Sequence, residues 1–223
     1  NRASGDVVTR RSPFSFTFHH VANTVRVGDT IQLDVFEVFR DAHLMVGGAF
    51  DIWLNKMRRD SEINFEAIRF AIPLADGANV TARGLLGRDV TLACTRSQCD
   101  QLRLPRINPG YQGQSYCFVY AMQTKWGGGP FASQNVVKVD VCRQEVHALG
   151  EFHKAGQYPH ELLFVPSPSN DTAEDNGLLV GHLLDGPASA SFLQVVDART
   201  LRQIANASLP FRLGEMIHGN WFD

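Results

Sequence analysis

The chain has 223 residues and a formal net charge of -2, with 21 Lys and Arg against 23 Asp and Glu. This balance lacks the basic footprint of a nucleic-acid-binding protein, so no nucleic-acid partner is expected. No apolar run reaches the roughly 18 residues of a membrane-spanning helix, and no signal-peptide pattern opens the sequence. The first residue is Asn, which indicates a processed or truncated chain.

The pattern along the chain predicts strands and turns. Residues 14–18 alternate apolar and small polar side chains with the period of two that is typical of a strand. Residues 30–36 alternate in the same way, and Val27-Gly28-Asp29 before them predicts a hairpin turn. Residues 41–61 are predicted to be partly helical or irregular. Further strands are predicted at residues 7–10, 63–73, 90–94, 116–122, 136–141, 162–165, 178–184, 192–197 and 203–209.

These strands are short and are separated by Gly, Pro, Asn and Asp, and the chain holds fifteen Phe, nineteen Gly and ten Pro. Such a pattern favours an all-β fold: a sandwich, a barrel or the blades of a propeller. No strict repeat is visible in the sequence, so periodicity alone does not choose among the three.

The four cysteines are ambiguous. Cys94 and Cys99 flank a polar turn, whereas Cys117 and Cys142 lie in apolar, strand-like surroundings. We expect free thiols in a reducing compartment, with a Cys94–Cys99 disulfide as the alternative. Three Asn-x-Ser/Thr triplets occur, at Asn79, Asn170 and Asn206. Such triplets arise often by chance and would matter only in a secreted protein.

Several motifs, in order and spacing, resemble those of the carotenoid oxygenase family. They are Phe18-His19-His20-Val21-Ala22-Asn23, residues 52–58 with 68–74, residues 104–113, 158–166, 174–180, 192–198 and 205–210, and the terminal Ile217-His218-Gly219-Asn220-Trp221. The family contains carotenoid and apocarotenoid cleavage dioxygenases, lignostilbene dioxygenases and the retinoid isomerohydrolase. The resemblance implies an all-β, seven-bladed propeller. Residues 1–223 would form the C-terminal part of that single domain, roughly its C-terminal half.

The resemblance also implies an iron site. In this family four histidines hold Fe2+, and His19 and His218 match the third and fourth of them, with His20 as a register-shifted alternative to His19. Neutral imidazoles suit ferrous iron, and vacant coordination positions admit O2 and substrate. Because four neutral ligands offset none of the charge of the ion, carboxylates that accept the other imidazole N–H protons become important. Glu161 matches the catalytic supporting carboxylate of His218.

Two positions depart from the family pattern, and the second, Ala22, is of smaller consequence. Where the family has the glutamate that supports the first motif histidine, this chain has Arg103, and Ala22 stands where the motif has Asn. A guanidinium has no acceptor for an imidazole N–H and would repel a nearby cation. We therefore expect either a weakened site, or an Arg103 that points away while Gln101 or a backbone carbonyl orients His19. The remaining histidines match no ligand motif and are expected in loops or on solvent faces: His43, His147, His153, His160 and His182.

The reaction that the resemblance implies is insertion of both atoms of O2 across a conjugated C=C bond of a carotenoid, an apocarotenoid or a related polyene. Two alternatives stay open: isomerohydrolase-like chemistry within the family, and a catalytically inactive propeller that only binds. The sequence does not determine the localisation, for which the cytoplasm or a plastid is expected. A peripheral membrane contact through an N-terminal half is also left open.

Overall fold

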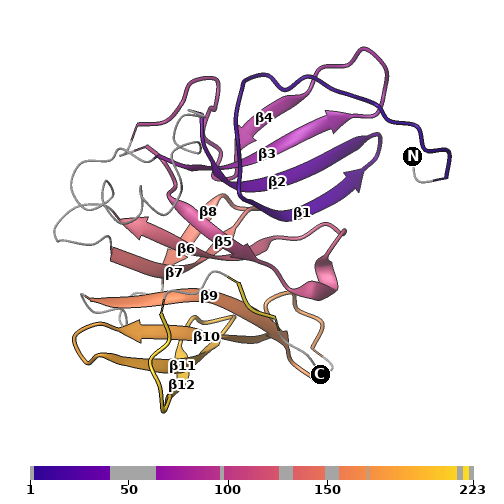
Figure 1. Cartoon of the computed structure of the whole chain (residues 1–223). Coiled ribbons are helices and arrows are strands. Elements are labelled where there is room, and N and C mark those ends of the chain that lie inside the picture. The colour runs from indigo at the N-terminus through magenta and orange to yellow at the C-terminus, as the bar shows by residue number, and fades with distance from the viewer. Residues whose placement is uncertain are drawn as a thin grey trace.

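The computed structural model describes residues 3–40, 64–95, 98–125, 133–148, 156–169, 171–214 and 218–220. Within these ranges the chain forms three four-stranded antiparallel sheets, which are stacked one upon the next in Figure 1. The same ranges contain no α-helix, and their helical turn is Pro109–Tyr111. This confirms the all-β class. No helix in the described part of the chain is long and apolar enough to cross a membrane.

Each sheet takes its strands in chain order. The first contains β1 (His20–Val27), β2 (Thr30–Val38), β3 (Glu66–Pro73) and β4 (Thr81–Gly84). The second contains β5 (Leu102–Arg106), β6 (Phe118–Lys125), β7 (Ser133–Asp140) and β8 (Glu145–Ala148). The third contains β9 (Gln157–Pro166), β10 (Gly177–Asp185), β11 (Ala190–Asp197) and β12 (Gln203–Ser208). Four-stranded up-and-down sheets of this kind are the units from which propellers are built.

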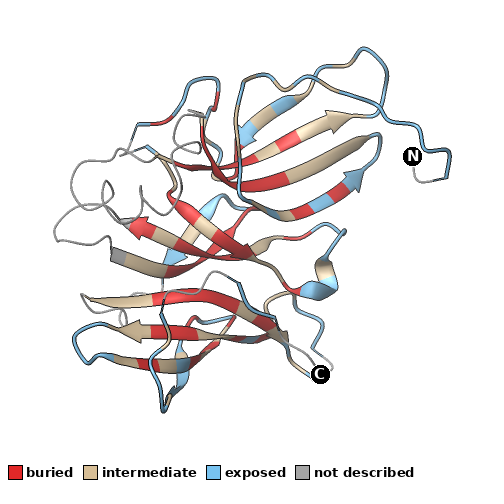
Figure 2. Ribbon diagram, viewed as in Figure 1, coloured by how far each residue is buried: buried red, intermediate tan, exposed pale blue. Residues whose placement is uncertain are grey.

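The first strands of the three sheets, β1, β5 and β9, lie next to one another where the sheets meet, with β5 between the other two. β5 contacts β1 and β2 of the first sheet and β9 of the third. Clusters of buried apolar residues join the sheets, and Figure 2 marks the buried parts of the strands in red. Phe36 and Val119 belong to the cluster between the first and second sheets, and Tyr120 and Phe164 to the cluster between the second and third. This packing brings β1, β2, β5 and β9 together.

The strand predictions succeed for parts of eight of the strands, but regular alternation alone does not guarantee a strand. The hairpin at Val27-Gly28-Asp29 is confirmed, since it joins β1 to β2 and Gly28 has the positive φ of 58° that such a turn requires. Residues 7–10 and 90–94 form no strand, and in residues 14–18 Thr17 alone makes a bridge, to Phe39. The strands β1, β4, β5 and β8 were not predicted, because they are short or interrupted by bulges. Residues 41–61 lie outside the described residues.

All four cysteines are paired, so the expectation of free thiols is wrong. Cys94 is bonded to Cys99 and Cys117 to Cys142. The second pair could not be recognised from spacing, because it depends on the register of β6 and β7. That register places Phe118 opposite Asp140, and Val141 donates its N–H to the carbonyl of Cys117. The cysteines that immediately flank these strand ends therefore meet.

We expect the Cys117–Cys142 disulfide to stabilise the fold more than Cys94–Cys99, because it closes a longer loop, with a sequence separation of 25 against 5. Chain-entropy reasoning gives about 3 kcal/mol for the longer loop and about 2 kcal/mol for the shorter one. Urea unfolding followed by circular dichroism, with each cysteine pair replaced by alanine, measures both. A larger loss from the Cys94 and Cys99 replacement would contradict this account.

Candidate metal centre

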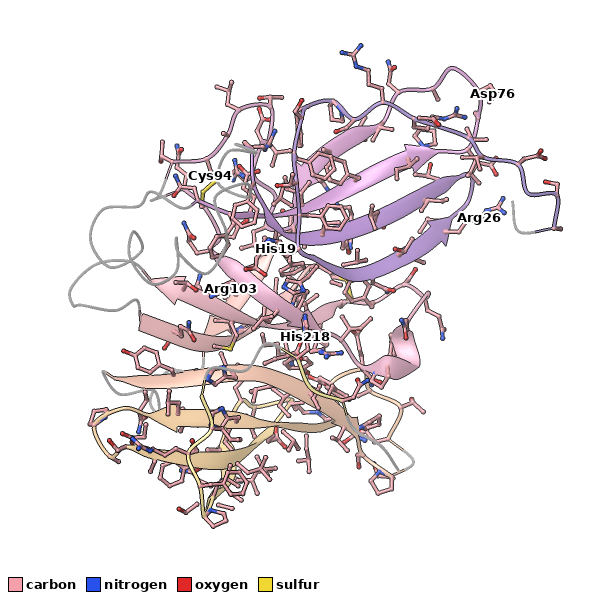
Figure 3. The ribbon with its side chains drawn as sticks, viewed as in Figure 1. His19, Arg26, Asp76, Cys94, Arg103 and His218 are labelled. Atoms are coloured by element: carbon pink, nitrogen blue, oxygen red, sulfur yellow. A yellow bond between two sulfur atoms is a disulfide. The ribbon has the colours of Figure 1, made fainter. Side chains whose placement is uncertain are left out.

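Three histidines gather where β1 begins. His20 is the first residue of β1 and His19 precedes it, and the centroids of their rings lie 6.0 Å apart. The ring of His218 lies 5.1 Å from that of His20, almost perpendicular to it. Figure 3 shows His19 and His218 near the junction of the sheets. The sequence prediction paired His218 with His19; the ring contact that the structure gives to His218 comes instead from His20.

Neither predicted ligand lies on a strand in the described part of the chain. His19 occupies a bend, and residues 218–220 have no regular secondary structure. Neither histidine therefore projects from a regular strand. His19 packs its ring 5.0 Å from that of Phe39, and its side chain is 35% exposed, whereas that of His20 is 16% exposed.

A carboxylate that the sequence reasoning missed faces these histidines. Glu37 lies near the end of β2, its side chain is 4% exposed, and its φ is 52°. The register between β2 and β3 shifts between Val35 and Val38, which marks a bulge at this point. A bulge re-aims side chains that a regular strand would direct to alternate faces. Glu37 is thereby directed towards the start of β1.

The two oxygens of Glu37 have different partners. Oε2 lies 2.6 Å from Nε2 of His20. Oε1 accepts a 2.8 Å hydrogen bond from Nε of Arg103 and lies 3.8 Å from Nδ1 of His19. Burial by itself raises the pKa of Glu37, but the two histidines and the Arg103 charge together outweigh burial, so this pKa lies well below its ordinary value. Glu37 is therefore a carboxylate at neutral pH.

These contacts correct the interpretation of Arg103. The guanidinium neither points away from the histidines nor stands alone near them, since it forms a buried ion pair with Glu37. Gln101 was proposed as the acceptor for His19, but the carboxylate beside that imidazole is Glu37. The acid expected at position 103 is thus supplied by the neighbouring strand β2. The charge of Arg103 is offset by that same acid.

Glu161 and His218 form a second group, as the sequence suggested. Nδ1 of His218 lies 3.1 Å from Oε1 of Glu161, whose side chain is 5% exposed. The other oxygen, Oε2, accepts hydrogen bonds from Nη2 of Arg106 at 2.8 Å and from the N–H of Gly219 at 3.1 Å. Arg106 also donates to the carbonyl of Gly219 at 2.9 Å. Arg106, which the sequence reasoning did not single out, therefore fixes the segment that carries His218.

The two carboxylates share a common design. Each is buried, each lies beside a histidine, and each is paired with an arginine of β5, Arg103 for Glu37 and Arg106 for Glu161. β5 has a register shift between these two arginines, with Leu104 at a φ of 48°. One short strand thus contacts the acid of the first sheet with Arg103 and the acid of the third sheet with Arg106.

The residues at the start of β1 fit a divalent cation. His19, His20 and Glu37 each offer one ligand atom, and the three atoms lie within 4.8 Å of one another. Oε2 of Glu37 is buried and accepts no aligned hydrogen bond, although it lies close to Nε2 of His20. Two imidazoles and a carboxylate form the donor set that binds Fe(II) in many non-haem oxygenases. A second set of possible ligands, Cys117, Cys142 and Asp140, includes the disulfide and offers no thiolate.

Two further histidines are buried, contrary to expectation. His160 on β9 and His182 on β10 stack with ring centroids 4.8 Å apart and are 5% and 7% exposed. Burial lowers the pKa of His182, which favours its neutral form. Both line a cavity of about 290 Å³ that also touches Glu161 and His218. His147 is exposed on β8, and His43 and His153 lie outside the described residues.

A family model described as retinal pigment epithelial membrane protein matches residues 1–223. Among curated proteins, the chain is 27% identical over 221 residues to β,β-carotene 15,15'-dioxygenase of Gallus gallus, covering 91% of this chain and 40% of the relative. It is 31% identical over 154 residues to the chloroplastic carotenoid cleavage dioxygenase 8 of Arabidopsis thaliana, covering 69% of this chain and 24% of the relative.

Solved structures show the same fold. A variant of the apocarotenoid oxygenase of Synechocystis superposes with a TM-score of 0.74 at 21% identity, covering 99% of this chain and 42% of that one. A cobalt-substituted form of the Synechocystis enzyme gives a TM-score of 0.68 at 21% identity, with 92% and 39% covered. The chain thus spans about two-fifths of the length of these proteins.

Replacing Arg106 by leucine should destabilise the fold because it leaves the buried carboxylate of Glu161 without its counter-ion. Loss of one partner of a fully buried pair costs about 3–5 kcal/mol. We expect about 2 kcal/mol, because the Arg106 side chain is 30% exposed. The matched control is Arg199→Leu, which removes surface ion pairs with Asp171 and Asp175 and should lower the free energy of unfolding far less. Equal losses in urea unfolding would show that Arg106 has no special role.

Proposed function

Because the chain belongs to the retinal pigment epithelial membrane protein family, the carotenoid oxygenases, we propose that it is part of a non-haem Fe(II) dioxygenase. The enzyme would cleave a conjugated C=C bond of a carotenoid or apocarotenoid with O2. The names of relatives from animals, plants and fungi support the substrate class. The observation that carries the proposal is the pairing of two motif histidines with buried carboxylates, Glu37 beside His20 and Glu161 beside His218.

The ligands would come from both histidine groups. His218 and the His19–His20 pair would hold the iron, and the geometry favours His20 over His19 because its ring faces His218 and its Nε2 faces Glu37. When bound, Fe(II) would supply the activation of O2. Glu161 would keep the His218 ring in one orientation by holding its Nδ1 atom, and Glu37 would do the same for His20. The two carboxylates would also offset the charge of the ion.

The chain would form roughly the C-terminal half of a seven-bladed propeller. It contains three four-stranded sheets in a sequence that spans 40% of the length of the chicken relative. If each sheet is one blade, three of seven blades agree with a span of 40% of the relative's length. The remaining histidine ligands would then come from the part of the protein beyond these three sheets.

The ion pair at Arg103 bears on the alternative of an inactive binding protein. That alternative rested on the arginine in place of a supporting carboxylate and on the part of the family's propeller that residues 1–223 do not span. The pairing of Arg103 with Glu37 argues against the first ground, because the histidines have a carboxylate and the guanidinium has a counter-ion. Isomerohydrolase-like chemistry would use the same residues, and no contact within the described ranges favours it over oxygenation.

The decisive variants exchange the two charges. In the full-length protein, Glu37→Gln should lower iron affinity about 10- to 100-fold, the usual effect of losing a carboxylate that supports a ligand. Arg103→Glu alone should also weaken binding, since it removes the counter-ion of Glu37 and places two buried acids side by side. The double change Glu37→Arg with Arg103→Glu should recover affinity, because it restores one acid and one base. Iron content by elemental analysis and apocarotenoid cleavage under O2 are the measurements.

Arg202→Glu, at an exposed position, is the charge-matched control and should change neither iron content nor cleavage. If Arg103→Glu raises the iron affinity, the acid at 37 does not support the histidines, and the assignment of Glu37 is wrong. A full-length protein that binds the polyene and iron but consumes no O2 would overturn the dioxygenase proposal itself.

A further inference from the structure

The cysteines carry information about where the protein matures. The sequence contains four cysteines, and all four are joined in the two disulfides. Fully paired cysteines are typical of proteins that fold in an oxidising compartment, and they are rare in the cytosol. Cys94 is buried, and the half-buried Cys117 is linked to a residue 25 positions away. Both bonds are therefore part of the folded structure.

Two glycosylation triplets lie on the outer rims of the sheets. Asn79 precedes β4, the outermost strand of the first sheet, and Asn206 lies on β12, the outermost strand of the third. Asn79 and Asn206 are exposed, as are the hydroxyl residues that complete the triplets, Thr81 and Ser208. The third triplet begins at Asn170, which lies outside the described residues.

The edges of β4 and β12 are the places where an attached glycan has room. An edge strand presents unpaired backbone N–H and C=O groups, which invite pairing with another chain. Every residue of β12 from Ile204 to Ser208 is exposed, so a glycan at Asn206 would displace no packed side chain. A bulky hydrophilic group at these edges would also oppose edge-to-edge association.

We propose that the protein matures in the secretory pathway and carries N-linked glycans at Asn79 and Asn206. In each transfer the Nδ2 atom of the asparagine forms a bond to the anomeric carbon of a lipid-diphosphate-linked oligosaccharide. The lipid diphosphate leaves, and the amide gives up one proton. In each disulfide, two thiols lose two protons and two electrons to an oxidising dithiol–disulfide enzyme, which is reduced. The proposal is independent of the iron chemistry and departs from the cytoplasmic or plastid localisation that the sequence suggested.

The test uses the full-length protein with its own N-terminus, isolated from its native cells. We expect an enzyme that removes N-glycans to shift its mass and to leave aspartate at positions 79 and 206 in peptide mass spectra. In peptide mass spectra, alkylation of the denatured, unreduced protein should leave Cys94, Cys99, Cys117 and Cys142 unmodified, and alkylation after reduction should modify all four of them. Alkylation of these four cysteines before reduction, or unmodified asparagine at both positions, would overturn the proposal.

Conservative variants separate glycosylation from other effects of substitution. Thr81→Ala and Ser208→Ala should each abolish one glycan, whereas Thr81→Ser and Ser208→Thr preserve the triplets and should retain both. All four variants leave the asparagines and the cysteines in place. If the Ala and Ser variants at position 81 carry the same modification, the attachment at Asn79 does not depend on the triplet and is not N-linked glycosylation.

Discussion

The arrangement of the site depends on two buried ion pairs that share one strand. Glu37 and Glu161 belong to the first and third sheets, and their carboxylates are almost inaccessible to water. A buried carboxylate without a partner costs several kcal/mol, so neither would be tolerated alone. β5 lies between those sheets and provides Arg103 to one acid and Arg106 to the other. These two ion pairs offset the cost of burying the acids. Because both arginines belong to β5, the pairs also fix the position of Glu37 and its neighbour His20 relative to Glu161 and its neighbour His218.

This arrangement keeps a buried carboxylate beside the histidines although the chain departs from the family motif at position 103. The family pattern places an acid on the strand that here contains Arg103. In this protein the acid stands on β2 and the base on β5, so the pair keeps one negative and one positive charge. The position of the Glu37 carboxylate relative to His20 then depends on the bulge in β2. The bulge changes the direction of the Glu37 side chain from the one it would have in a regular strand. Charge and backbone geometry therefore have to change together.

The sequence predicted those strands and motifs that can be recognised from residues adjacent in the chain. Regular alternation revealed most of β2, apolar runs bounded by turn residues revealed much of β10 and β11, and the motifs located His218 and Glu161. It did not reveal β1 or β5, because bulges at Val21–Asn23 and between Arg103 and Arg106 interrupt their period. The break of alternation at Phe36-Glu37-Val38 was the available signal for Glu37. Its partners are 17 residues upstream and 66 residues downstream, so only tertiary structure could assign its role.

Irregular backbone is concentrated where the candidate ligands meet. Register shifts occur in β1 beside His20, in β2 at Glu37, in β5 between the two arginines, and between β9 and β10 next to Glu161. Glu37 and Leu104 also have positive φ, a conformation that costs about 1–3 kcal/mol in residues other than glycine. A regular ladder would send neighbouring side chains to opposite faces. Convergence of these side chains on one point requires the departures from regularity, which persist because the packing of the three sheets and the contacts with Arg103 and Arg106 hold each side chain in place.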